Sequence, residues 1–114
     1  MLNTAQIEQF HQHGYLVLPG LGSLEYCEQV LQFAQQQLDA VALPIEYEAD
    51  TRYPGAPASR DAEGGQTARR LLQAYARTPL IANWATQAGL AEALGQLLGA
   101  GVRMSQVHHN CIMT

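Results

Sequence analysis

Apolar residues first recur at helical spacing near the N-terminus, over residues 4–13. This helix is predicted to begin at Thr4, whose hydroxyl can cap free amides, and to end before Gly14, which suits a left-handed helix end. Residues 15–18 are aromatic, aliphatic and β-branched, and a proline and a glycine follow them. This short run predicts a strand that is buried on both faces.

A second and longer helix is predicted after Ser23, which can cap it. Apolar residues follow at spacings of three and four: Leu24, Cys27, Leu31, Ala34, Leu38 and Val41. Glutamines and an aspartate fill the opposite face, so this helix should bury one stripe on the outside of something larger. Residues 4–43 are therefore expected to form a helix-strand-helix unit.

The apolar period disappears over residues 44–66, where prolines and paired glycines interrupt the chain. A long irregular segment is uncommon in a compact domain. It is either a mobile surface excursion or a functional lid over a pocket, and both interpretations stay open.

Helical spacing returns over residues 67–99, first in residues 69–75. Thr78 and Pro79 then start a short helix, because threonine caps helices and proline suits the first helical position. Its buried face would contain Leu80, Ile81 and Trp84. A leucine-rich helix follows over residues 90–98, and a glycine comes directly after it.

Residues 102–113 alternate in the manner of a core β-strand. One face of this strand would carry Val102, Met104, Gln106, His108, Asn110 and Ile112. Polar side chains in the middle of a buried strand need partners from the protein or from a ligand. The neighbouring His108 and His109 would point to opposite faces, which argues against their sharing one metal ion.

Composition narrows the class of partner. The 114 residues suit one domain or a piece of one, and ten acids against six arginines give a net charge of −4 without any lysine. Nucleic acid is therefore not expected as a partner. No apolar run is long enough for a membrane span, and no secretory signal is evident, so we expect a cytoplasmic protein without a membrane partner. Cys27 and Cys111 lack metal or disulfide spacing and are expected to be reduced thiols.

The order of these motifs resembles the phytanoyl-CoA dioxygenase family. The matching N-terminal positions are Thr4, Gln6, Ile7, Phe10, residues 14–21 and Ser23. A long helix, a variable loop, a helix ending in Leu97-Leu98-Gly99 and the pattern Gln106-x-His108-x-Asn110 follow in the family's order. The resemblance covers nearly the whole chain and is weakest in residues 44–66.

The resemblance implies an α+β fold, namely the N-terminal helices and first strands of a double-stranded β-helix, or jelly roll. It also implies an Fe(II)- and 2-oxoglutarate-dependent dioxygenase that hydroxylates a small or medium organic substrate. The family holds iron with His-x-Asp and a distant histidine. No His-x-Asp occurs here, because His11 is followed at the second position by His13, His108 by Asn110 and His109 by Cys111. The iron ligands are therefore expected beyond residue 114, and this chain alone is expected to be inactive, with no catalytic or metal-binding residue of its own.

By the same resemblance, Asn110, with Gln106, is expected to bind 2-oxoglutarate, since an amide donates to a carboxylate without adding charge. His108 lies on the same predicted face, where relatives contact the substrate. The alternatives are a catalytically inactive relative and a non-catalytic helical binding or scaffolding domain whose last strand pairs with a partner chain. The sequence makes no prediction about the oligomeric state.

Overall fold

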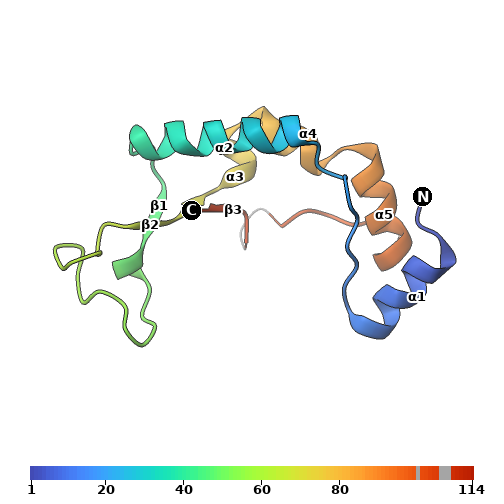
Figure 1. Cartoon of the computed structure of the whole chain (residues 1–114), viewed down its shortest axis with the longest axis horizontal. Coiled ribbons are helices and arrows are strands. Elements are labelled where there is room, and N and C mark those ends of the chain that lie inside the picture. Colours follow the sequence, from blue (N-terminus) through green and yellow to red (C-terminus); the bar gives the residue numbers. More distant parts are fainter. Residues whose placement is uncertain (100, 106–108) are drawn as a thin grey trace.

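The structure, a computed structural model, describes residues 1–99, 101–105 and 109–114 and shows a mixed α+β fold (Figure 1). Its elements, in chain order, are α1 (Thr4–His13), α2 (Leu24–Asp39), β1 (Ile45–Tyr47), a 3-10 turn (Glu48–Asp50), β2 (Ala68–Leu72), α3 (Ala74–Arg77), α4 (Pro79–Ala85), α5 (Ala88–Leu98) and β3 (Cys111–Met113). The α+β class predicted from the sequence is confirmed at this level.

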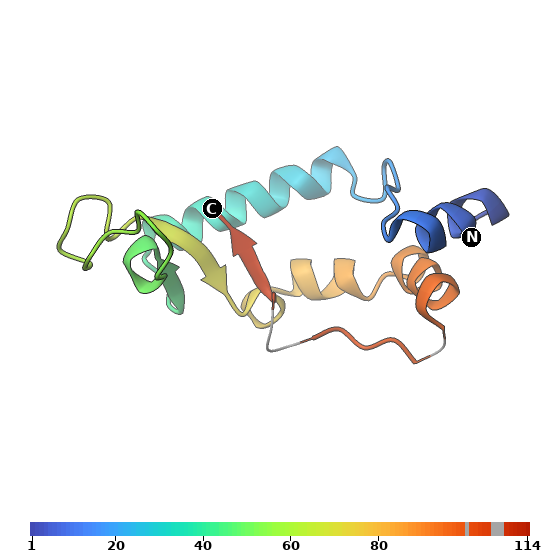
Figure 2. The same cartoon turned by 90° about the horizontal axis from the view of Figure 1, so that it is seen from below.

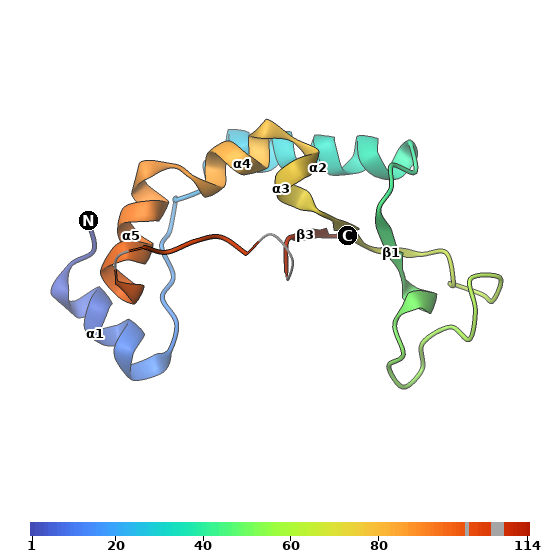
Figure 3. The same ribbon diagram turned by 180° about the vertical axis from the view of Figure 1, so that it is seen from behind.

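The elements form an arch. Helices α2 and α4 lie along its top, the sheet lies under one end, and α1 and α5 lie under the other (Figures 1 and 3). The molecule measures 52 × 31 × 25 Å and has a radius of gyration of 17.2 Å, against about 13 Å for a compact domain of this length. Its accessible surface is 8139 Å², whereas a compact monomer of this mass exposes about 6,100 Å². The arch thus leaves far more surface uncovered than a closed domain does.

Helix α1 has the predicted bounds, but its cap lies one residue earlier. The side chain of Asn3 accepts a hydrogen bond from the Gln6 amide at 2.9 Å, and the Gln6 side chain accepts one from the Asn3 amide at 2.9 Å. This reciprocal pair satisfies two of the free donors at the helix start. Gly14 ends the helix at φ 78°, as predicted.

Helix α2 also confirms its prediction, and Ser23 caps it by accepting from the Tyr26 amide at 3.1 Å. Of the six residues in its predicted apolar stripe, only Ala34 and Leu38 pack into the core, and Leu31 and Val41 are exposed. Ala34 is buried and Leu38 packs beside it, whereas Leu24 is exposed. The helix therefore packs on the sheet with its C-terminal half alone.

The sheet is antiparallel with the order β1-β2-β3. Leu71 in the central strand lies opposite Ile45 on one side and Ile112 on the other, and it is fully buried. Ala34 from α2 completes this core. One face of the sheet is thereby attached to α2, and β3 is the edge strand nearer the middle of the arch (Figures 1 and 2).

Two predictions about strands are wrong. Residues 69–75 were expected to begin a helix, but residues 68–72 form β2, because pairing with strands on both sides and burial of Leu71 outweigh local helical preference. The strand predicted at residues 15–18 is absent, and both Tyr15 and Val17 are exposed there. An extended run needs a neighbouring strand to pair with, and the described residues provide none at this place.

The segment 44–66 is more regular than its composition predicts. It begins with β1 and the 3-10 turn, and side-chain contacts hold the remainder to the sheet. Arg60 forms an ion pair with Asp50 at 2.8 Å, and its guanidinium lies 4.5 Å from the centre of the Tyr47 ring. Figure 1 places this loop at the sheet end of the arch, far from α5.

The C-terminal strand is shorter than the predicted 102–113. Strand β3 contains Cys111–Met113, and residues 101–105 are not part of any sheet. His109 has a φ of 57°, which interrupts an extended conformation directly before the strand. The predicted strand is therefore present at Cys111–Met113 and absent from residues 102–105.

Candidate functional site

Of the three residues predicted to share a polar strand face, the structure describes Asn110. Gln106 and His108 lie outside the described residues, so their expected roles stay predictions. The side-chain oxygen of Asn110 accepts a hydrogen bond from the backbone amide of Tyr75 at 2.8 Å. Its backbone oxygen accepts another from the amide of Ala74 at 3.1 Å. Asn110 thus ties the start of β3 to the first turn of α3.

This contact gives Asn110 a structural role that the sequence did not predict. The first amides of a helix have no partner within the helix, and an asparagine oxygen commonly satisfies one of them. Here the capping residue lies 35 positions further along the chain, so no local pattern could reveal it. A carboxylate would bind the opposite end of the same side chain, the Nδ2 amide, because that end donates hydrogen bonds.

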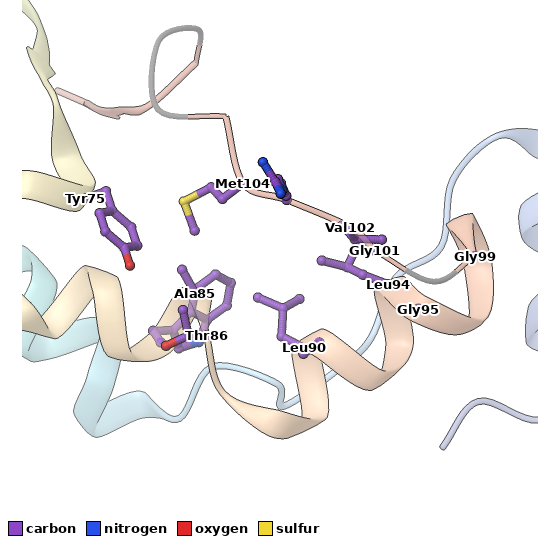
Figure 4. A pocket seen from close by; sticks show the side chains of 13 residues that line it. Tyr75, Ala85, Thr86, Leu90, Leu94, Gly95, Gly99, Gly101, Val102 and Met104 are labelled. Atoms are coloured by element: carbon purple, nitrogen blue, oxygen red, sulfur yellow. The ribbon is translucent and has the colours of Figure 1, made fainter.

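A pocket of about 690 Å³ lies beside Asn110's partner Tyr75, between α4, α5 and residues 101–105 (Figure 4). Its largest lining side chains are Tyr75, Trp84, Leu90, Leu94, Arg103 and Met104. Both the volume and the mainly apolar walls fall within the range of small-molecule sites. Since Asn110 binds the backbone of Tyr75, the predicted cofactor residue and one wall of the pocket are mechanically connected.

Trp84 is one of the residues that line this pocket. Its ring stacks on Tyr26 with centroids 5.6 Å apart and planes 14° apart, which fixes its orientation between α2 and α4. Trp84 also borders a second apolar pocket of about 450 Å³, which Phe10 and Leu16 line from the other side. The sequence predicted Trp84 as a core residue, but it is half-buried and separates two cavities.

Charged side chains at the sheet end bind one another. Arg70 pairs with Glu46 across β1 and β2, and Arg69 pairs with Glu48 at 3.3 Å. The hydrogen bond from Arg70 to Glu46 is the main cause that raises the pKa of the arginine. These pairs hold strands and loop together.

Arg77 joins three segments at the junction of α2 and the sheet. Its guanidinium donates to the Leu72 carbonyl at 2.6 Å, to the Ala42 carbonyl at 2.9 Å and to the Pro44 carbonyl. It also donates to the side chain of Gln37 at 3.1 Å. Burial lowers the pKa of Arg77, as expected when a cation loses water. Sequence reasoning missed this residue, because three of its four acceptors are backbone carbonyls, which leave no sequence pattern.

The described residues do not fit a bound iron ion. Among them, no three histidine, cysteine, aspartate or glutamate side chains lie close enough together to hold a metal. Cys27 and Cys111 are free thiols. These residues therefore offer no metal site by themselves.

The helices in the described ranges are all too short or too polar to cross a membrane. Comparisons of this chain with protein families, with curated proteins and with solved structures gave no match in any of the three.

Proposed function

We propose that the protein carrying this chain is an Fe(II)- and 2-oxoglutarate-dependent dioxygenase that hydroxylates a small or medium organic substrate. In this proposal the chain supplies the outer helices and first strands of a jelly-roll fold, together with one side of the substrate pocket. The observation that carries the proposal is the link through Tyr75 between Asn110, the predicted oxoglutarate residue, and an apolar pocket of ligand size.

Two further features support this proposal. The resemblance in the order of motifs runs from Thr4 to Asn110, which is nearly the whole chain. In addition, a helix covers one face of an antiparallel sheet, as in a jelly-roll oxygenase with helices on the outside of its barrel. Iron ligands would have to come from residues other than those described, so activity is proposed for the whole protein and not for these residues alone.

The proposed reaction consumes oxygen and 2-oxoglutarate and yields hydroxylated substrate, succinate and carbon dioxide. The contributions of this chain would be to hold the organic substrate in the pocket and to bind oxoglutarate through Asn110 and Gln106. His108 would contact the substrate. The direct test is succinate release by the whole protein, dependent on both ferrous iron and 2-oxoglutarate. Absence of iron binding and of turnover with every candidate substrate would refute the proposal.

Asn110 allows a sharper test, because its two functions depend on opposite ends of one side chain. Asn110→Asp keeps an oxygen that accepts from the Tyr75 amide, but it replaces the donating amide with a negative charge. We expect the far-ultraviolet circular dichroism to be preserved and the affinity for oxoglutarate to fall by roughly tenfold or more. Asn110→Ala is the companion variant and should lose both functions. Unchanged oxoglutarate affinity in Asn110→Asp would leave Asn110 with its structural role alone.

The edge of β3 favours a second candidate function, a non-catalytic binding or scaffolding domain. In the described part of the chain β3 pairs only with β2, so its other edge can accept a strand from a partner. The large exposed surface of the arch agrees with such an interface. A protein that binds no iron but associates with a partner through this edge would support the second candidate. A catalytically inactive relative of the oxygenases would also bind no iron.

A further inference from the structure

The pocket under α4 and α5 has walls that suit the apolar part of a ligand. Trp84 lines it from α4. Leu90 and Leu94 lie along α5, and Val102 and Met104 face them from the extended segment (Figure 4). At about 690 Å³ the pocket can enclose a medium-sized organic molecule. An apolar body would be stabilised there because it removes its own surface and these side chains from water.

The same pocket contains one charge. Of the described residues that line it, Arg103, which is exposed, alone has a charged side chain. Arg69 and Arg70 are paired with glutamates at the sheet end, whereas no carboxylate of the described ranges forms an ion pair with Arg103. A guanidinium beside apolar walls is complementary to a carboxylate, which it can bind through two parallel hydrogen bonds.

From this combination we infer that the pocket binds an amphipathic organic anion, with its apolar body against Trp84, Leu90 and Leu94 and its carboxylate at Arg103. This inference rests on the proposed function in one respect: the bound anion is the substrate class of the proposed oxygenase. It narrows that class from any organic molecule to carboxylates with an apolar chain or ring system. Neutral and cationic molecules of the same shape are weaker ligands.

Trp84 provides the measurement, because it is the single tryptophan of the chain and lines the pocket. The purified whole protein is titrated with decanoate, decanol and decylammonium, each below its aggregation concentration, while tryptophan emission is recorded. If the whole protein contains further tryptophans, they are replaced by phenylalanine first. Iron and oxoglutarate are left out, so the result does not depend on catalysis. We expect decanoate to change the emission and to bind roughly tenfold more tightly than the other two probes.

Arg103→Gln tests the assignment of the anion. It should weaken decanoate binding by roughly tenfold and leave decanol binding unchanged, because glutamine keeps much of the side-chain length but removes the charge. The matched control is Arg52→Gln, an exposed arginine in the loop at the sheet end. This control should leave the binding of all three probes unchanged.

The possible outcomes separate the inference from the proposed function. Equal affinities for the three probes, or an Arg103→Gln variant that binds decanoate like the wild type, would overturn the recognition of an anion. No emission change with any probe would overturn the pocket as a binding site. Decanoate binding without any succinate release would leave the pocket assignment intact and count against the oxygenase alone.

Discussion

Under one end of the arch Leu71 is completely enclosed, whereas under the other end Ala93 is the one buried residue among those described, and the larger side chains line cavities. We call the first region, made of the C-terminal part of α2 with β1, the loop of residues 48–67, β2, β3 and α3, the sheet half. The second region, made of α1, α4 and α5, is the helical half (Figure 1). The sheet half also contains the ion pairs and the contacts of Arg77.

The difference in packing indicates that the sheet half stabilises the fold, whereas the helical half offers cavities that can bind a ligand. A cavity deprives its lining atoms of packing partners, so the helical half should open at lower cost than the sheet half. The stack of Tyr26 on Trp84 joins the N-terminal part of α2, which continues into the sheet half, to α4 of the helical half. A ligand or another polypeptide in the pocket would supply the packing that the helical half lacks.

The largest predicted effect is that of Leu71→Ala. Removing a fully buried leucine from the sheet half should lower the free energy of unfolding by about 3–4 kcal/mol. Leu98→Ala is the matched control in the helical half, where the leucine is 61% exposed, and it should change stability by less than about 0.5 kcal/mol. Urea titrations followed by circular dichroism measure both, and equal effects would contradict the comparison.

The next largest effect is expected for Arg77→Ala, which removes the donor group that three backbone carbonyls share. The free energy of unfolding should fall by roughly 2 kcal/mol, because partly buried acceptors lose their partner. The Arg52→Ala variant, with an exposed arginine in the nearby loop, should be close to neutral. Thermal unfolding measures both variants. A neutral Arg77→Ala would mean that the sheet half does not depend on this junction.

The helices were the predictable part of this fold, since their signals are local. Ser23 and Thr78 cap α2 and α4 as predicted, and the glycines at 14 and 99 end α1 and α5. The strands were not predictable in the same way. Leu71 lies in a strand because Ile45 and Ile112, distant in sequence, pair beside it. Residues 69–75, from which the helix was predicted, do not show that these two distant strands pair beside Leu71.

The candidate site was predictable only in part for a related reason. Asn110 was selected for its position in an alternating segment, but its contact with Tyr75 depends on the return of the chain after many residues. Leu90 and Leu94 follow the apolar period of a core helix, and the structure places both at a pocket. Periodicity identifies which side of a helix avoids water, and it does not distinguish a packed core from the wall of a cavity.

A smaller effect of opposite sign is predicted for Gly95→Ala in α5. No heavy atom lies within 4 Å of the position that a Cβ atom would take there, so alanine fits without displacement. Alanine also lowers the entropy of the unfolded chain, and the variant should be stabilised by about 0.5–1 kcal/mol. Gly65→Ala is the contrasting variant in the sheet half, where the new carbon would lie 2.1 Å from the Ser59 carbonyl oxygen and should destabilise the loop. Thermal unfolding compares the two, and destabilisation by Gly95→Ala would contradict the open packing of the helical half.

The smallest predicted effect concerns the loop at the sheet end under acid conditions. Hydrogen bonds from Arg60, and then from the Tyr47 amide, hold the pKa of Asp50 below its ordinary value of 3.8. Because the folded-state pKa is the lower one, this stabilisation is fully present above the ordinary value and is lost as the pH falls through the folded-state pKa. Both groups are exposed, so salt should weaken the effect.

Hydrogen-exchange protection factors of the loop amides in residues 51–64 measure this loss. They should decrease a few-fold between about pH 5 and pH 2, while amides in the centre of β2 keep their protection. Asp50→Asn removes the titrating group, and its loop should show low protection at both pH values. If the wild-type loop and the centre of β2 lost protection together, the loop and the core of the sheet half would open as one unit. The ion pair of Asp50 with Arg60 would then support the whole sheet half and not the loop alone.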